Sequence, residues 1–382
     1  MKYIAALLCV VLVSTTACKS LDAPSPKDAP NLGLKFLGSR TIERTPGGVL
    51  KNFGGISGID IDPVTGTAFL VSDDRSDLEP ARFYQAKIGI DSQGFSHLDV
   101  ISSTPLLQKN GDAYPNAKAG GDVPDPEALR IDPRSGALVW SSEGDQKLGL
   151  NPFVRRVDQA GRFLDELFTS PFLVISKDGV RGVRNNLAFE GLTYDTGNLW
   201  VAMEAPLFQD GPVANLEHGA FARFTKLSPD GKLLGQYAYP VDAIPVAPTG
   251  GKKRGDNGVS EILSLASLGS PSNHHLLVVE RSGREVDDLV FQFEIRIYEA
   301  DLGEATNVAD LPSLEGASIR SATKRLVMNL NNADIGPVDN IEGAAWGPRL
   351  PNGHPTLVLV SDDNFNAKQV SQFLAFEVLG AP

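Results

Sequence analysis

Short apolar stretches separated by turns of glycine, proline, aspartate and serine dominate the sequence. In one recurring arrangement, an apolar stretch leads through such a turn to a second apolar stretch that ends in an acidic residue. The arrangement returns at intervals of 63 to 82 residues. Each stretch has the length and flanking turns of a β-strand, and strand pairs at a repeated interval are typical of propeller blades. The first strands of the five copies begin near residues 56, 126, 189, 259 and 341.

Further strands complete most of these blades. Hairpins are predicted at 82–88 with 95–102, at 153–158 with 162–168, and at 220–227 with 233–239. The last copy offers one further strand, at 372–379, whereas the strand at 34–43 precedes the first copy and has no blade. We expect this N-terminal strand to complete the last blade and close the ring, which removes exposed sheet edges.

The predicted fold is therefore an all-β protein, a single β-propeller of five four-stranded blades over residues 33–382. A six-bladed ring is the alternative, because the fourth interval is the longest and holds a spare strand at 325–331. Long insertions separate the repeats, and such loops on a rigid scaffold often carry function.

The first 32 residues have the features of an export signal. Residues 1–17 contain a basic start and an apolar run that is too short to span a bilayer, as in a signal peptide. The small residues before Cys18 resemble a lipobox, so we expect a lipid on Cys18 and a flexible tether over residues 18–32. Since no aspartate follows Cys18, an outer-membrane lipoprotein facing the periplasm or the cell surface is predicted. Plain secretion is the alternative.

Composition narrows the classes of function. The 35 basic and 47 acidic residues give a net charge of −12, which argues against a nucleic-acid partner. Both cysteines lie in the first 18 residues, which excludes a disulfide scaffold and a cysteine-ligated zinc or iron–sulfur site in the body. We expect a monomer that contacts the membrane through its lipid anchor only.

One position of the repeat is the candidate metal site. The innermost strand of a propeller blade lines the central channel, so equivalent residues of the five copies converge there. Carboxylates that meet in this way need a counter-charge, which a metal ion can supply. Carboxylate and hydroxyl oxygens suit Ca²⁺, and the absence of histidine from this position of the repeat argues against zinc. Glu261 is an alternative ligand in the fourth copy, and a merely wet, polar channel is the alternative for the whole set. The five aligned residues are Ser57, Glu127, Glu190, Ser260 and Glu342.

A second acidic layer ends the second strand of each copy, with cations interleaved. Arginines beside an acidic ring suit an anionic substrate, because guanidinium groups bind phosphate oxygens in a bidentate manner. A polar rim with surface salt bridges is the alternative. The acids are Asp73, Glu143, Glu204, Glu280 and Asp362. The candidate anion-binding residues are Arg75, Arg184, Asn186, Arg281 and Arg284, with the basic run 252–254 nearby.

Several segments resemble the bacterial phytase-like family described as "esterase-like activity of phytase". They are Ser-Gly-Ile-Asp-Ile-Asp-Pro at 57–63, Asn-Leu-Ala-Phe-Glu-Gly-Leu at 186–192, Val-Val-Glu-Arg at 278–281 and Leu-Val-Ser-Asp-Asp-Asn at 359–364. The resemblance covers most of residues 33–380 and implies a propeller and a phosphoesterase. The order Ser, Glu, Glu, Ser, Glu is also similar to the central calcium site of the calcium-activated nucleotidases (apyrases).

These observations predict an exported, calcium-dependent phosphoesterase that acts on a small phosphate ester at the channel. In this hypothesis Asp73 or Asp362 accepts a proton, and Arg75 and Arg281 stabilise the phosphoryl charge. Arg184, Asn186 and Arg284 would bind the substrate. A non-catalytic surface binding propeller with a structural calcium is one alternative. A calcium-dependent lactonase or carboxylesterase is the other.

Overall fold

A computed structural model describes residues 31–45, 47–167, 170–176 and 179–380, and there the chain forms five four-stranded antiparallel sheets. The first sheet comprises β2 (Ile56–Ile61), β3 (Thr67–Ser72), β4 (Arg82–Asp91) and β5 (Gly94–Pro105). The second comprises β6 (Pro126–Ile131), β7 (Leu138–Ser142), β8 (Phe153–Val157) and β9 (Phe163–Leu167). The third comprises β10 (Phe189–Tyr194), β11 (Leu199–Met203), β12 (Ala220–Leu227) and β13 (Leu233–Val241).

The last two sheets close the ring. The fourth comprises β14 (Gly258–Ser264), β15 (His275–Asp287), β16 (Val290–Asp301) and β17 (Thr323–Asn329). The fifth comprises β18 (Ile341–Gly347), β19 (Thr356–Ser361), β20 (Ser371–Leu379) and the N-terminal strand β1 (Gly33–Ile42). Short 3-10 turns occur at Gly48–Leu50, Phe208–Asp210, Leu265–Leu268 and Leu330–Asn332.

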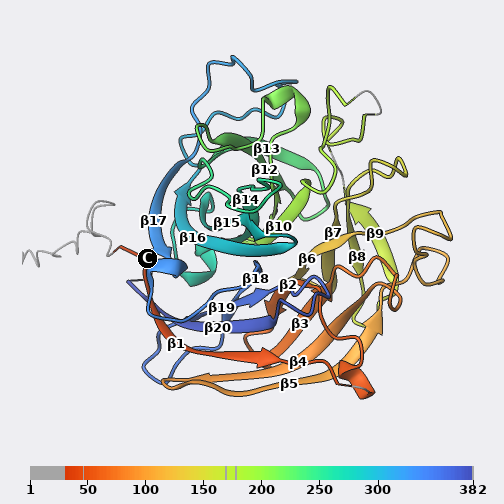
Figure 1. Ribbon diagram of the computed structural model, residues 1–382, viewed down its shortest axis with the longest axis vertical. Coiled ribbons are helices and arrows are strands. Elements are labelled where there is room, and N and C mark those ends of the chain that lie inside the picture. The colour runs from red at the N-terminus through yellow and green to blue at the C-terminus, as the bar shows by residue number, and fades with distance from the viewer. Residues whose placement is uncertain (1–30, 46, 168–169, 177–178, 381–382) are drawn as a thin grey trace, which may run out of the picture.

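The five sheets are the blades of a propeller. Their first strands, β2, β6, β10, β14 and β18, contact one another in cyclic order and surround the central axis (Figure 1). As predicted, β1 pairs with β20 and completes the fifth blade. Both the five-bladed fold and its closure by the N-terminal strand are therefore confirmed.

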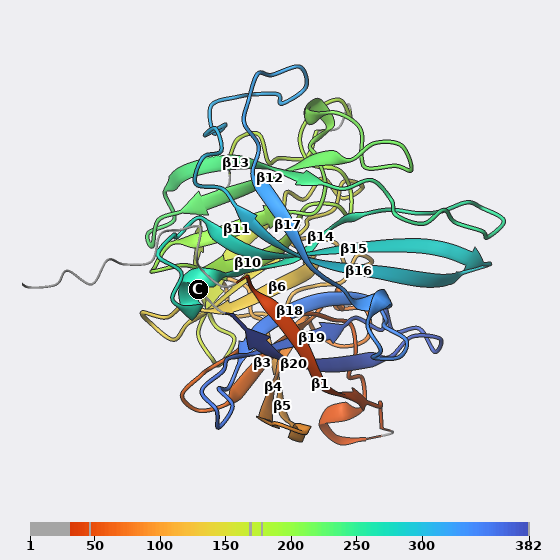
Figure 2. The same cartoon turned by 90° about the vertical axis from the view of Figure 1, so that its left-hand side faces the viewer.

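The six-bladed alternative is wrong. The spare strand predicted at 325–331 is β17, which pairs with β16 as the outermost strand of the fourth blade. The fourth interval is long for two reasons. The hairpin of β15 and β16 extends to the edge of the molecule (Figure 2), and a loop separates β16 from β17.

The predicted signal peptide and Cys18 lie outside the described residues, so the export and lipid predictions stay predictions. In the described part of the chain, no helix is long and apolar enough to cross a membrane.

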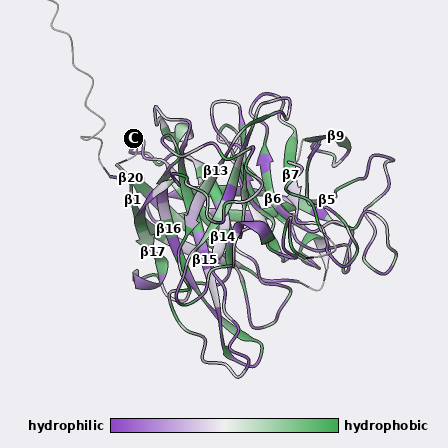
Figure 3. Ribbon diagram, turned by 90° about the horizontal axis from the view of Figure 1, so that it is seen from above, coloured by the Kyte–Doolittle hydropathy of each residue, from purple (hydrophilic) through white to green (hydrophobic). Residues whose placement is uncertain are grey.

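Apolar side chains pack between neighbouring blades. Trp140 of β7, for example, belongs to one buried cluster with Val71 and Phe83 of the first blade, and Ile59 of β2 shares another with Val360 of β19. The strands accordingly carry long stretches of hydrophobic colour in Figure 3. Burial of each such side chain contributes about 1.5–3 kcal/mol, so the interfaces between blades hold the ring together.

In three of the five blades the inner strands approach one another too closely for a side chain at the position where the repeat has glycine. A Cβ atom on Gly58 would lie 2.7 Å from the carbonyl oxygen of Glu127 on the next inner strand, and one on Gly191 would lie 3.0 Å from the backbone nitrogen of Ile262. Gly343 is equally confined, with the backbone nitrogen of Ile59 at 3.2 Å. The glycines of the Glu-Gly and Ser-Gly pairs of the repeat are therefore required by the close packing of the inner strands around the axis.

A buried ion pair fills the axis beside this contact. A guanidinium nitrogen of Arg130 lies 2.6 Å from Glu261, and both side chains are buried. Glu261 takes the place of the small residue in the fourth blade and accepts a hydrogen bond from the backbone nitrogen of Leu192 at 3.1 Å. The carboxylate of Glu261 is therefore paired with Arg130, which argues against Glu261 as the alternative metal ligand. Arg130 also donates to inner-strand carbonyl groups of four blades, at Ile59, Leu129, Leu192 and Ile262.

Replacement of Arg130 by methionine should destabilise the whole ring. The change leaves the carboxylate of Glu261 buried without its partner and removes donors from four carbonyl groups. We expect a loss of about 3–5 kcal/mol in the free energy of unfolding, measured by urea denaturation. The matched control is Arg162→Met, whose side chain is 73% exposed and whose ion pair should contribute about 1 kcal/mol or less. Equal losses in the two variants would contradict this role for Arg130.

Candidate functional site

Each inner strand has an irregularity in its pairing at the same place. In β2 the partner register skips Ser57, and the same one-residue bulge occurs at the equivalent place of β10, β14 and β18. In β6 the bulge includes Glu127 and Ala128. A β-bulge bends the strand and turns the extra side chain away from the regular alternation. The bulged residues are the five that the sequence aligned, and we call them the bulge ring: Ser57, Glu127, Glu190, Ser260 and Glu342.

In four blades the second layer directly follows the second strand, whereas in the fourth blade it lies within β15 and its register differs from the prediction. In those four blades the acid donates its backbone N–H to the carbonyl group of the residue that precedes the inner strand, for example Asp73 to Gly55 at 2.7 Å. In the fourth blade the residue paired in this place with Gly258 is Arg281, not Glu280. The strand-end ring is therefore Asp73, Glu143, Glu204, Arg281 and Asp362.

Glu280 instead belongs to a polar network between the third and fourth blades. Successive side chains of a strand point to opposite faces, so the shift of one residue turns Glu280 away from the ring. Its carboxylate accepts hydrogen bonds from the hydroxyl of Tyr239 at 2.9 Å and from the side-chain amide of Asn257 at 3.0 Å, and it contacts the ammonium group of Lys324. These contacts neutralise a fully buried carboxylate in place.

Arg281 joins the two rings. Its guanidinium lies 3.0 Å from a carboxylate oxygen of Glu204 and 3.7 Å from one of Glu342. Its side chain is 13% exposed. Glu342 also accepts hydrogen bonds from the hydroxyl of Ser57 at 3.2 Å and from the amide of Asn340 at 2.8 Å.

Two residues that sequence reasoning missed belong to this site. Asp125 and Asn340 occupy the place that pairs with the strand-end ring, where the other blades have Gly55, Ala188 and Gly258. Extension of the repeat alignment by one residue toward the N-terminus could have found them. The bulge ring, the strand-end ring, Asp125 and Asn340 together form the axial cluster.

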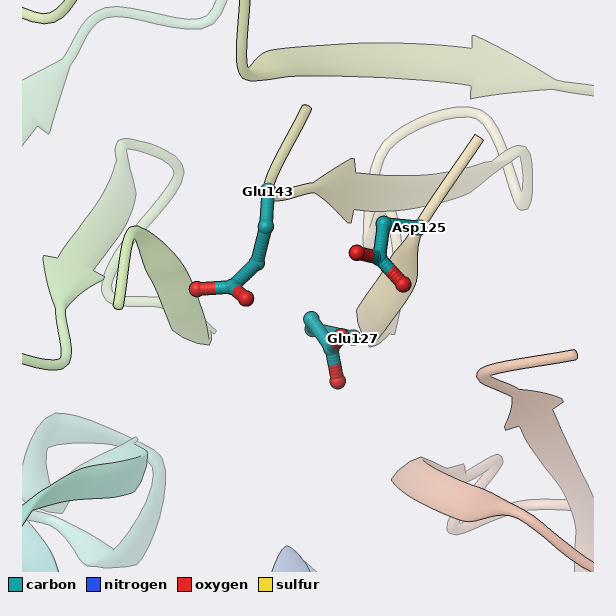
Figure 4. Close-up of side chains that lie close together, drawn as sticks. All are labelled: Asp125, Glu127 and Glu143. Atoms are coloured by element: carbon teal, nitrogen blue, oxygen red, sulfur yellow. The ribbon is translucent and has the colours of Figure 1, made fainter. Parts of the chain in front are cut away.

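Carboxylates of the axial cluster approach one another closely enough to share a cation. Within the described residues, two groups of three acids each bring one oxygen per residue to within 4.8 Å of the others. Both groups combine the bulge ring with the strand ends, and Glu143 belongs to both. The groups are Asp125, Glu127 and Glu143 (Figure 4), and Glu143, Glu190 and Glu204.

Burial and mutual repulsion raise the pKa of these acids. Burial is the largest cause throughout, and neighbouring carboxylates add to it, as Glu190 does for the pKa of Glu127. The pKa of Asp125 rises to about 7 through burial, although Arg75 opposes the shift. Burial likewise raises the pKa of Glu204 to about 8 against the opposing charge of Arg281. The pKa values of Glu143, Glu190, Asp73 and Asp362 are raised well above their ordinary values for the same reasons.

Several buried oxygen atoms of the cluster have no hydrogen-bond partner. They include Oδ1 of Asp73, Oε2 of Glu143, Oγ of Ser260 and Oδ1 of Asn340. A buried polar atom without a partner costs about 1–3 kcal/mol, and a carboxylate without a counter-charge costs more. Carboxylate, hydroxyl and amide oxygens are the ligands of hard divalent cations. The axial cluster can therefore bind a metal ion.

The predicted anion-binding residues fall into two sets. Arg281 lies inside the axial cluster, and Arg75 lies beside it, 2.5 Å from Asp145 and 3.6 Å from Asp125. Two of the others make contacts elsewhere: Arg184 donates to the carbonyl groups of Pro206 and Gly211, and Arg284 donates to Gln292. Asn186 is an exposed residue with a φ of 56°.

The raised pKa values predict how stability depends on pH when a chelator removes metal. The carboxyl groups of Asp125 and Glu204 have ordinary pKa values of 3.8 and 4.5 and folded values of about 7 and about 8. Between these values the folded chain binds more protons than the unfolded chain, so the free energy of unfolding decreases as pH rises. We expect the melting temperature to fall from about pH 5 to about pH 8.

Glu204→Gln tests the origin of that decrease. The amide does not ionise, so the variant should lose less stability over the same pH range than the unchanged protein does. A melting temperature of the unchanged protein that is flat or rises over this range would contradict the assignment. Thermal unfolding followed by circular dichroism measures both.

Comparison with solved structures finds distant similarities. The catalytic domain of the Coprinopsis cinerea GH62 α-L-arabinofuranosidase is 9% identical, with 91% of this chain and 97% of that chain covered and a TM-score of 0.42. The Penicillium chrysogenum α-L-arabinanase is 12% identical, with 90% and 98% covered and a TM-score of 0.41. A glucose dehydrogenase is 11% identical, with 91% and 99% covered and a TM-score of 0.38.

A search of curated protein sequences finds no match to this chain. A family model does match, over residues 51–365, which include the inner strands of all five blades. Its description is "Phytase-like: Esterase-like activity of phytase". Since the match spans most of the sequence, this chain belongs to the phytase-like family.

Proposed function

We propose that this protein is a calcium-dependent hydrolase of small phosphate esters and that it acts at the axial cluster. The observation that carries the proposal is the meeting of buried carboxylates with Arg281 at the axis. Such a site combines ligands for a cation with a cation of its own, and an anionic phosphate ester bound to metal needs both. Membership of the phytase-like family agrees with a hydrolase of esters.

Calcium is the metal that the donor set favours. Glu127, Glu190 and Glu342 would hold it, with Ser57 and Ser260 as direct or water-mediated ligands. All five are oxygen donors, and Ca²⁺ accepts six to eight such ligands in flexible geometry, whereas zinc sites usually include histidine or cysteine. When bound, the ion supplies a Lewis acid for a phosphoryl oxygen and lowers the pKa of a bound water.

The chain's own groups would bind the phosphoryl group and move the proton. Arg281 contacts bulge-ring and strand-end carboxylates alike, so its guanidinium is placed to offset negative charge on a phosphoryl group. Asp362 is the preferred proton carrier, because burial and the charge of Asp73 raise its pKa. The backbone nitrogen of Asn364 donates to its Oδ1 at 2.7 Å and holds the carboxyl group in position.

A carboxylic ester or lactone is the second candidate substrate. The family description refers to esterase-like activity, and a Lewis acid polarises a carbonyl group as well as a phosphoryl group. The non-catalytic alternative is a binding protein whose calcium ion only stabilises the ring of blades.

Assays on the purified protein with calcium and with a chelator distinguish these functions. We expect calcium-dependent release of phosphate or phenol from aryl phosphate mono- and diesters and from nucleotides, together with a calcium-dependent rise in melting temperature. Calcium-dependent hydrolysis of aryl acetates or lactones in place of phosphate esters would favour the second candidate. A calcium-dependent rise in melting temperature without turnover would indicate that the ion is only structural. No response to calcium in any assay would overturn the proposal.

Glu190→Gln should lower calcium affinity and turnover together. The change removes one carboxylate charge from the bulge ring while it keeps the side-chain volume, so we expect turnover to fall by at least about 100-fold at limiting calcium. Glu217→Gln is the matched control, because this glutamate is 84% exposed. Added calcium should restore part of the activity of Glu190→Gln. Turnover of Glu190→Gln equal to that of the control would contradict a role for Glu190 as a ligand.

A further inference from the structure

A cavity lies at the outer edge of the second blade, away from the axial cluster. Its volume is about 520 Å³, within the range of roughly 300–1,000 Å³ that is usual for small-molecule sites. The outermost strand, β9, forms one wall, and the connection from β5 to β6, residues 106–125, forms the other. Figure 1 shows β9 at the edge of the molecule. Of the described residues that line the cavity, none belongs to the axial cluster.

Backbone contacts hold the two walls of the cavity together. The backbone nitrogen of Leu107 donates to the carbonyl group of Gly161 at 2.9 Å. A Cβ atom on Gly161 would lie only 1.9 Å from the carbonyl oxygen of Pro105. The turn before β9 is therefore in direct contact with the connection between the two blades, and the cavity is formed without a ligand, as most small-molecule sites are.

Arg155 of β8 is fixed in one orientation beside the cavity. Its guanidinium lies over the ring of Phe153, 3.6 Å from the ring centroid. It donates to carboxylate oxygens of Asp122 at 2.6 Å and Glu166 at 2.8 Å, and to the hydroxyl of Tyr114 at 3.1 Å. Charge-assisted bonds on two sides hold the guanidinium in place. Because the hydroxyl of Tyr114 accepts this bond, its own proton stays available for a further hydrogen bond.

The charged side chains that line the cavity are balanced once their partners are counted. Two carboxylates share Arg155, and the third, that of Asp165, has an oxygen 2.6 Å from a guanidinium nitrogen of Arg156. The remaining lining cation, Lys109, is exposed. This part of the described chain therefore favours neither an anionic nor a cationic ligand. The three acids are Asp122, Asp165 and Glu166, and the three cations are Lys109, Arg155 and Arg156.

Phe163 and Leu164 give the cavity an apolar side. Leu164 is 51% exposed, next to carboxylate oxygens that accept hydrogen bonds and to Lys109 and Tyr114, which donate them. A ligand that matches this lining has apolar C–H groups together with many groups that both donate and accept hydrogen bonds. Sugar rings have this chemistry, because each hydroxyl group is both a donor and an acceptor.

We propose that this cavity binds a small neutral saccharide of about the size of a disaccharide. The C–H face of a sugar ring packs against Phe163 and Leu164, and its hydroxyl groups bond to Asp122, Glu166 and Lys109. The protein would then bind a carbohydrate at the edge of the second blade in addition to its action at the axis. The inference goes beyond the proposed function and does not rest on it, because neither the axial cluster nor a metal ion takes part.

Binding of four neutral disaccharides to the purified protein tests the proposal. Maltose, cellobiose, lactose and N,N′-diacetylchitobiose are each titrated in the presence of a chelator, with binding detected by saturation-transfer NMR and affinity measured by calorimetry. We expect at least one of them to bind. Leu164→Glu should weaken that binding by at least about tenfold, because a carboxylate replaces the apolar contact with the sugar ring. The matched control is Leu234→Glu, at the second residue of β13 as Leu164 is at the second residue of β9, since Leu234 is 49% exposed.

The outcomes decide the ligand class and the location separately. No binding of any of the four disaccharides to the unchanged protein would overturn the proposal. Tighter binding of glucuronate or glucosamine than of glucose would overturn the assignment to a neutral ligand. Equal affinities of Leu164→Glu and the control would overturn the location. Circular dichroism shows whether each variant folds, and Lys109→Ala, at an exposed residue, takes the place of Leu164→Glu if that variant does not. Because the chelator removes calcium, failure of calcium-dependent hydrolysis leaves this test unaffected.

Discussion

The close approach of the five inner strands is the constraint on which the rest of the structure depends. Gly58, Gly191 and Gly343 leave no room for a Cβ atom between neighbouring inner strands. The side chain before each of these glycines is bulged out of the regular pairing, so equivalent side chains meet around the axis. Arg130 lies two residues beyond the small position of its own strand, and it joins four blades through their carbonyl groups. The same packing therefore forms the ring and assembles the site.

The site departs from the rule that buried charges are paired. Arg130 and Glu261, the buried network of Glu280, and the pair of Arg82 with Asp74 at 2.6 Å all obey the rule. The axial cluster instead gathers acids whose pKa values burial and mutual repulsion raise. A chain commonly gives up stability in this way at a functional site, where a bound ligand supplies the missing interaction. Buried carboxylates that are paired with a cation are therefore structural, whereas those with raised pKa values at the axis are candidate ligands.

The repeat made the fold and much of the site predictable. It located the inner strands, the closing strand and the bulge ring, because each depends on a pattern that returns in every blade. It failed where one blade departs from the pattern. The second strand of the fourth blade, β15, continues past Glu280, and Arg281 rather than Glu280 pairs with Gly258 in the strand-end ring. The long loop before β17 separates this outer strand from β16, so the repeat does not assign it to the fourth blade. The pair of Arg130 with Glu261 occurs in one copy only, so no repeat indicates it.

A crystal structure of the protein grown with calcium, with anomalous data collected at long wavelength, would show whether a calcium ion binds at the axial cluster. We expect an anomalous peak on the propeller axis within coordination distance of carboxylate oxygens of Glu127, Glu190 and Glu342. An axis without such a peak, in crystals that contain saturating calcium, would contradict it. The axial acids would then be protonated or hydrogen-bonded to water instead of bound to a metal ion.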